Sequence, residues 1–115
     1  MLAAVASLGA AAAGDPARGR EIALGRDANC VLCHELPGVR LAGNVGPSLA
    51  GIGSRLEAAQ LRSRIEDPAR LNPETVMPSY SKVEGLQRVA KEWQGKPVLT
   101  AEQIDDVVAY LGTLK

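Results

Sequence analysis

The stretch Cys30-Val31-Leu32-Cys33-His34 decides the fold of this chain. It contains both cysteines and the sole histidine of the 115-residue sequence. A C-x-x-C-H motif is typical of covalent haem attachment. Each thiol adds across one vinyl group of the porphyrin, and the histidine that follows points its imidazole at the iron. The motif therefore predicts one haem c, bound through Cys30 and Cys33, with His34 as an axial ligand.

A C-x-x-C pair has three other common uses. A redox dithiol of the thioredoxin kind opens a helix after a strand, and no alternating strand pattern precedes Cys30. Structural zinc takes four ligands, whereas this chain has three Cys and His residues altogether. A disulfide across so short a loop stabilises a protein less than one across a long loop. Haem attachment therefore explains the motif better than these alternatives.

The composition is that of a single globular domain whose core lacks large side chains. Hydrophobic residues make up 46% of the sequence, and 13 basic residues balance 13 acidic ones. A neutral chain argues against binding nucleic acid or a charged membrane surface, because both depend on clustered basic residues. The chain has one Trp, two Tyr and no Phe. Since aromatic side chains usually dominate burial, a large flat cofactor would complete this core.

Residues 1–13 differ in composition from the rest of the chain. They carry no charge, are mostly Ala and Leu, and end in Ala11-Ala12-Ala13. The stretch is shorter than the roughly 20 residues that span a bilayer, and its end matches the pattern that signal peptidase accepts. We expect an export signal remnant at 1–13, a mature domain over 14–115, a periplasmic location and no transmembrane segment. The alternative is an alanine-rich N-terminal helix.

The remainder of the sequence predicts helices joined by Gly- and Pro-rich loops. Asp15 as N-cap and Pro16 as first helical residue predict a helix that extends to about Leu24. The stretch Ser54-Arg55-Leu56-Glu57 has the pattern of a capping box and predicts a helix that ends at Asp67-Pro68. No strand of convincing length appears. The loops are expected at 36–53, 67–80 and 94–99.

The C-terminal segment has the clearest helical pattern. Thr100-Ala101-Glu102-Gln103 is a second capping box, and apolar residues follow it at helical spacing. Those residues are Ile104, Val107, Val108 and Leu111. Glycine is unfavourable inside a helix, so Gly19 is expected to mark a close crossing of the first and last helices, against Tyr110 or Leu111. A short helix containing Leu86, Val89 and Trp93 is also expected.

The iron needs a second axial ligand. A second histidine is not available, and both cysteines are expected in thioether bonds. Of the two methionines, Met1 belongs to the expected export signal, which leaves Met77 between Pro73 and Pro78. A thioether ligand is soft and raises the haem potential. Met77 is the predicted ligand, while a lysine (Lys82 being the nearest) and an open site remain alternatives.

Three stretches resemble the SoxX family of sulfur-oxidation cytochromes, within the class I cytochromes c. The most specific is Asn72-Pro73-Glu74-Thr75-Val76-Met77-Pro78-Ser79-Tyr80. The others are Gly14-Asp15-Pro16-Ala17-Arg18-Gly19-Arg20 and Asp105-Asp106-Val107-Val108-Ala109-Tyr110-Leu111. The resemblance implies an all-α class I cytochrome c domain over 14–115, with a few short helices and loops around one covalent haem. It also implies that the carbonyl of Pro47 orients the His34 ring.

The function that the resemblance implies is electron transfer. A SoxX-like subunit forms a heterodimer with a SoxA-like monohaem or dihaem cytochrome, and the pair acts as an L-cysteine S-thiosulfotransferase. The pair couples thiosulfate to a cysteine of a SoxYZ-like carrier, and the SoxX-like subunit passes electrons to a soluble cytochrome c without catalytic activity of its own. An independent class I cytochrome c shuttle and a gas-binding or catalytic haem protein with an open iron site remain alternatives.

Overall fold

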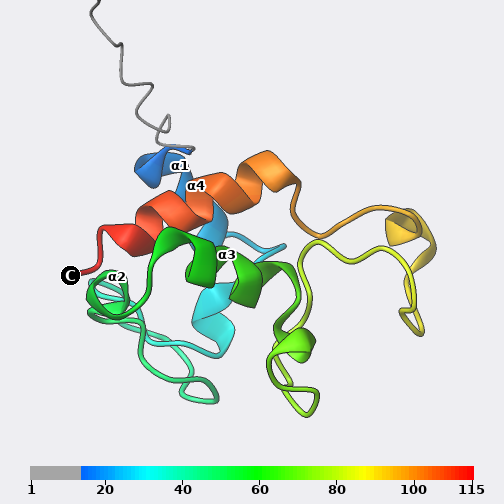
Figure 1. Ribbon diagram of the computed structural model, residues 1–115, viewed down its shortest axis with the longest axis horizontal. Helices are drawn as coiled ribbons and strands as arrows, with labels where there is room; N and C mark the ends of the chain where they lie inside the picture. Colours follow the sequence, from blue (N-terminus) through cyan, green and yellow to red (C-terminus); the bar gives the residue numbers. More distant parts are fainter. Residues whose placement is uncertain (1–13) are drawn as a thin grey trace, which may run out of the picture.

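The computed structural model describes residues 14–115, so the expected export signal at 1–13 lies outside the described residues. Over this range the chain forms helices and loops and no strand, which confirms the all-α prediction (Figure 1). No helix in this range is long and apolar enough to cross a membrane. The helices are α1 Pro16–Leu24, α2 Ile52–Arg55, α3 Ala58–Glu66 and α4 Ala101–Gly112, with 3₁₀ turns η1 Cys30–Leu32, η2 Pro68–Arg70 and η3 Lys91–Trp93.

Side-chain caps determine where α1 and α4 begin. Asp15 Oδ1 accepts hydrogen bonds from the backbone N–H groups of Ala17 (2.8 Å) and Arg18 (3.3 Å). Thr100 Oγ1 accepts from the N–H of Gln103 at 3.2 Å, and Gln103 Oε1 accepts from the N–H of Thr100 at 2.9 Å. Each cap satisfies N–H groups that the helix itself leaves without partners. Both predicted helix starts are therefore confirmed.

The first and last helices cross at Gly19, as predicted. A Cβ placed on Gly19 would lie 2.8 Å from the Cβ of Tyr110 and would overlap the backbone carbonyl of Asp106. Asp106 is buried, and its carboxylate accepts a hydrogen bond from Asp15 N at 2.8 Å and pairs with Arg18 Nε at 3.3 Å. The missing side chain of glycine therefore lets the two helices approach, and the carboxylate joins them beside the crossing.

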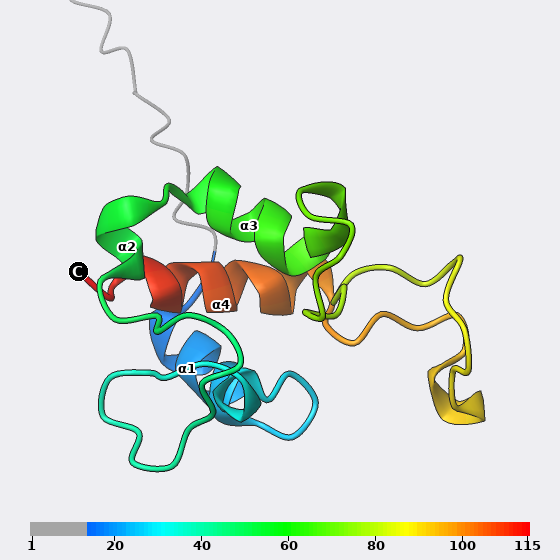
Figure 2. The ribbon, with the colours of Figure 1, turned by 90° about the horizontal axis from the view of Figure 1, so that it is seen from below.

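The core lies on both sides of α4, between α1 and α3 (Figure 2). The apolar residues predicted for this helix are all buried, and Ile104 and Val107 are the largest side chains with almost no exposed surface. Leu61 and Ile65 from α3 are buried in the same cluster. Among the described residues the buried aromatic side chains are Tyr80 and Tyr110. The protein core therefore consists mostly of medium and small aliphatic groups.

The predicted start of the middle helix is wrong by one turn. Ser54 lies inside the separate short helix α2, and the extended backbone of Leu56 (ψ 140°) separates α2 from α3. The residue that caps α3 is Glu57. Its backbone N–H donates to Oε1 of Gln60, in the first turn of the helix, at 2.9 Å. The short helix α2 forms because Gly53 fits against the end of α4 and donates its N–H to Leu114 O at 2.8 Å. This contact is distant in sequence, so local spacing could not reveal it.

The predicted short helix at Leu86, Val89 and Trp93 is also wrong. The structure has one 3₁₀ turn there, Lys91–Trp93. Gly85 (φ 69°) and Arg88 (φ 56°) both have left-handed backbone conformations, which interrupt a right-handed helix. Leu86 remains 44% exposed. The helical spacing of apolar residues in this segment therefore does not correspond to a buried helix face.

Substitution of Gly19 by alanine is expected to lower the free energy of unfolding by about 2–3 kcal/mol, because overpacking at a helix crossing forces the backbones apart. Thermal and denaturant unfolding of the haem-loaded protein measure the change. Gly112, also in α4, is the matched control, because a Cβ there meets no atom within 4 Å. Gly112→Ala should raise stability by up to about 1 kcal/mol through helix propensity. Equal effects of both substitutions would contradict the crossing as the reason for Gly19.

Candidate haem site

The C-x-x-C-H motif forms a tight turn directly after α1. Asn29 has a left-handed backbone (φ 43°, ψ 51°), a conformation that Asn tolerates better than most residues. Within the turn, the N–H groups of Cys33 (3.2 Å) and His34 (2.9 Å) donate to the carbonyl of Cys30. Both thiols are free and half-buried. Burial raises the pKa of Cys30 to about 11, with a smaller contribution from the charge of Cys33, so this thiol is neutral at physiological pH.

The His34 ring is held by a single backbone acceptor. Its Nδ1 lies 2.6 Å from the carbonyl oxygen of Pro47. A carbonyl oxygen only accepts hydrogen bonds, so Nδ1 carries the proton and Nε2 keeps its lone pair. A hydrogen bond of this kind determines the tautomer and the orientation of a ligating imidazole. In this ring, Nε2 is the nitrogen that could ligate iron.

A glycine-containing loop packs closely against the motif. The N–H groups of Gly43 and Gly46 donate, each at 2.7 Å, to the carbonyls of Val31 and Cys33. A Cβ on Gly46 would lie 2.7 Å from His34 Nδ1 and 2.9 Å from Nε2. A side chain at this position would therefore displace the imidazole. The loop orients the histidine by close contact as well as through the Pro47 carbonyl.

Met77 lies on the loop that follows η2. Its backbone N–H donates to Thr75 Oγ1 at 3.1 Å, and its half-buried side chain packs against the core cluster. The neighbouring Val76 is 82% exposed. Leu32, between the two cysteines, is 66% exposed, and Leu71 is 59% exposed. Apolar side chains thus remain exposed on both loops that carry the predicted haem residues.

Tyr80 connects the methionine loop to the residues before the motif. Its side chain is buried, and its hydroxyl donates to the carbonyl of Ala28 at 2.9 Å. Its N–H donates to Ile65 O at 3.1 Å, and its own carbonyl accepts from Leu99 N at 3.0 Å. Burial raises the pKa of Tyr80 to about 12, and the charges of Cys30 and Cys33 add to this effect. The phenol is therefore a neutral donor throughout the physiological pH range.

Tyr80→Phe is expected to lower the free energy of unfolding by about 1–2 kcal/mol, because the buried carbonyl of Ala28 loses its partner. It should also lower the temperature at which the far-red iron–thioether absorption band disappears. The hydroxyl contributes fully below pH 10, its ordinary pKa, and this contribution is lost as pH rises through the higher pKa that burial gives the folded state. Alkaline unfolding of wild type and variant measures this difference. Identical profiles would exclude a role for the hydroxyl.

These residues fit a covalently attached haem. The structure provides two unpaired thiols in one turn, an imidazole with a free Nε2, and a half-buried thioether on a separate loop. A porphyrin is large, flat and apolar, so its burial against apolar side chains of the protein is favourable. It would also provide the large apolar group that the aliphatic core lacks.

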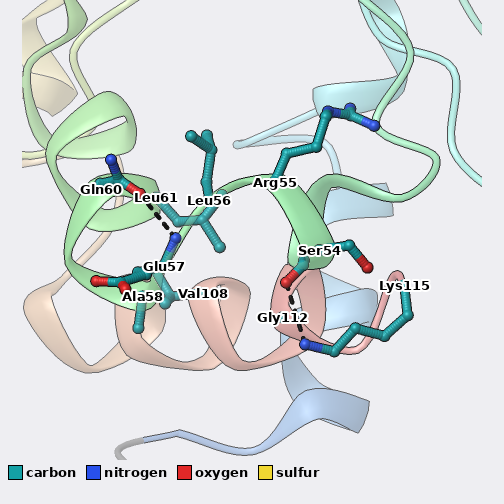
Figure 3. A pocket seen from close by; sticks show the side chains of 11 residues that line it. Ser54, Arg55, Leu56, Glu57, Ala58, Gln60, Leu61, Val108, Gly112 and Lys115 are labelled. Atoms are coloured by element: carbon teal, nitrogen blue, oxygen red, sulfur yellow. Dashed lines mark hydrogen bonds between the residues drawn. The ribbon is translucent and has the colours of Figure 1, made fainter.

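Another concave region lies away from these residues. A hollow of about 600 Å³ lies beside α2, the start of α3 and the end of α4, and Figure 3 shows the side chains that line it. Its lining contains no Cys, His or Met. Within it, Gln60 caps Glu57, and Lys115 Nζ donates to Gly53 O at 3.1 Å. The chemistry of these side chains gives no reason to place the cofactor there.

Sequence reasoning did not foresee the hydrogen bond from Tyr80 to Ala28 or the close contacts of Gly43 and Gly46 with the motif. The Gly46-Pro47 pair could have pointed to a close approach of backbone, because glycine permits contacts that a Cβ excludes. Tyr80 lies three residues after Met77, but its bond to Ala28 spans 52 residues. A pattern in the sequence does not report a hydrogen bond over such a separation.

Comparisons with known proteins agree with this geometry. The sequence matches the family model described as Cytochrome c over residues 16–115. A chain in the crystal structure of SoxXA from P. pantotrophus is 38% identical, with a TM-score of 0.80, over 89% of this chain and 82% of that chain. The c-type cytochrome SorU from Sinorhizobium meliloti is 28% identical, with a TM-score of 0.57, over 86% of this chain and 88% of that chain. The search of curated proteins found no match.

The family match and the structural similarity cover nearly all the described residues. They confirm the predicted class I cytochrome c fold and the predicted haem c. The single C-x-x-C-H motif provides for one haem. The chain belongs to the cytochrome c family and is a SoxX-like class I electron-transfer cytochrome with one covalently bound haem c.

Proposed function

We propose that the chain is the electron-transfer subunit of a SoxAX-type heterodimer. Its partner is a SoxA-like cytochrome that couples thiosulfate to a cysteine of a SoxYZ-like carrier, and a soluble cytochrome c accepts the electrons. The observation that carries the proposal is the similarity to SoxXA, at 38% identity and a TM-score of 0.80. The whole protein works in the periplasm, with residues 1–13 as the export signal remnant and 14–115 as the cytochrome c domain.

The haem is held by residues from two loops. Cys30 and Cys33 would attach it through thioether bonds, and His34 Nε2 and Met77 would ligate its iron. The free thiols, the Pro47 hydrogen bond and the half-buried Met77 support this assignment. When bound, the haem supplies one-electron redox chemistry at an iron whose Met/His ligation raises the potential.

The overall reaction determines what this subunit has to provide. Joining thiosulfate to a carrier thiol forms one S–S bond and releases two electrons and one proton: RSH + S₂O₃²⁻ → RS–S–SO₃⁻ + H⁺ + 2e⁻. The chain has no Cys or His outside the C-x-x-C-H motif. It therefore offers no spare thiol nucleophile and no spare imidazole base. Bond formation belongs to the partner, and this subunit carries the electrons away one at a time.

Mass spectrometry of the purified native protein tests the proposal. The expected result is a mature chain that begins at Gly14, carries one covalent haem and remains bound to a second haem protein. A haem-loaded chain that is always monomeric would contradict the heterodimer and favour the independent shuttle.

Binding of carbon monoxide to the ferrous protein tests whether Met77 occupies the second ligand position of the iron. It should be poor if Met77 is bound, and ready binding would indicate an open site.

A further inference from the structure

We propose that residues 82–98, which we call the arm, are the docking element for the partner subunit and bind an acidic face of it. The inference rests on the proposed heterodimer and adds the surface by which it forms. Figures 1 and 2 show the arm projecting away from the helices, beyond the loop that carries Met77. Its stem is closed by buried Tyr80 and Leu99, where Leu99 N donates to Tyr80 O at 3.0 Å.

The arm has a defined shape but makes few contacts with the rest of the domain. The turn η3 contacts no other helical element of residues 14–115. The hydrogen bonds of the outer arm are internal: Trp93 N to Ala90 O (2.8 Å), Lys96 N to Trp93 O (3.0 Å) and Gln94 Nε2 to Val89 O (3.5 Å). Ordering such a segment costs conformational entropy, and contacts with a partner would offset part of that cost.

The arm carries apolar side chains that the rest of the domain does not fully cover. Trp93, the sole Trp of the chain, is half-buried, and Val83 (40%) and Leu86 (44%) are exposed. Tryptophan is enriched among the residues that contribute most to binding. Permanent interfaces are larger and more apolar than transient redox contacts, so these apolar side chains favour a lasting partner over a transient electron acceptor.

The charge of the arm specifies the chemistry of that partner. It contains four of the thirteen basic residues of the chain and two of the thirteen acidic ones. The basic residues are Lys82, Arg88, Lys91 and Lys96, and the acidic ones are Glu84 and Glu92. A neutral chain thus places a net positive charge on its projecting segment. Complementary charge across an interface guides association and orientation, so the face that receives the arm should be acidic.

The test uses the haem-loaded chain and the SoxA-like subunit encoded in the same genome, with affinity measured by calorimetry at low and high salt. Trp93→Ala should weaken binding by about thirtyfold or more. Lys91→Glu should weaken it by about tenfold and reduce its salt dependence. Arg20→Glu is the matched control, because it changes the same charge at an exposed position on α1. It should alter affinity less than about twofold, because salt largely screens exposed charges that lie far from the interface.

The outcomes separate this inference from the proposed function. If the wild-type chain does not bind the subunit, the heterodimer itself is excluded. If the wild type binds and both arm variants bind equally well, the heterodimer stands and the arm is excluded. Self-association of the chain that Trp93→Ala abolishes would assign the arm to a second copy and overturn the inference. Haem content, the thioether band and the unfolding temperature should be unchanged in both variants, because η3 packs on no other helix.

Discussion

Replacing both cysteines, Cys30→Ala and Cys33→Ala, is expected to abolish cooperative folding. The described core is aliphatic, and its largest fully buried side chains are Ile104 and Val107. Loss of the haem removes the largest apolar group of the domain, which should cost several kcal/mol of a total stability of about 5–15 kcal/mol. Circular dichroism and thermal unfolding should show a loss of helicity, α4 included, and no sharp transition, because the small aliphatic core is then insufficient for cooperative folding.

The control for this experiment lies between the two cysteines. Leu32 is 66% exposed, and Leu32→Ala keeps both thiols. This variant should attach haem and unfold cooperatively, within about 0.5 kcal/mol of wild type, as surface substitutions usually do. If the double cysteine variant, prepared without haem, still unfolds in one cooperative transition, then the protein core is sufficient and our account of the fold is wrong.

Met77→Ala is expected to remove the far-red iron–thioether band and to lower the reduction potential. A soft thioether favours ferrous iron, so its loss favours the ferric state. The decrease should be on the order of 0.1 V, within the roughly 0.8 V range that axial ligands span. Spectroelectrochemical titration measures both effects in one experiment. The fold should persist, because both thioether bonds remain.

The neighbouring valine provides the control for the methionine. Val76 is 82% exposed, and Val76→Ala should leave both the band and the potential unchanged. An unchanged spectrum and potential in Met77→Ala would show that another residue ligates the iron. Lys82, the nearest lysine in sequence, would then be the first residue to replace.

Local sequence patterns predicted the parts of the fold that depend on local interactions. Asp15 and Thr100 cap helices within three residues of themselves, so their patterns were sufficient. The apolar spacing of α4 correctly predicted a buried face. Gly19 was identified because a glycine inside a helix is unfavourable without a close contact, and the contact with Tyr110 supplies the reason.

The parts that could not be predicted depend on contacts between distant residues. The capping pattern at Ser54 failed because Gly53 packs against the end of α4, a neighbour that the sequence does not reveal. The spacing of Leu86, Val89 and Trp93 suggested a helix that has no surface to pack on. The Tyr80–Ala28 hydrogen bond joins two loops 52 residues apart. Motif chemistry indicated the haem residues, whereas only the structure revealed what supports them.

Steady-state turnover of the reconstituted complex, with varied thiosulfate and varied cytochrome acceptor, tests the central claim of electron exit through this subunit. With Met77→Ala, we predict intact assembly, a lower maximal rate and a lower rate with the acceptor. The Michaelis constant for thiosulfate should change little or fall with kcat, because substrate binding is not affected. A large rise in that constant with an unaffected maximal rate would place this subunit in substrate binding and contradict the account.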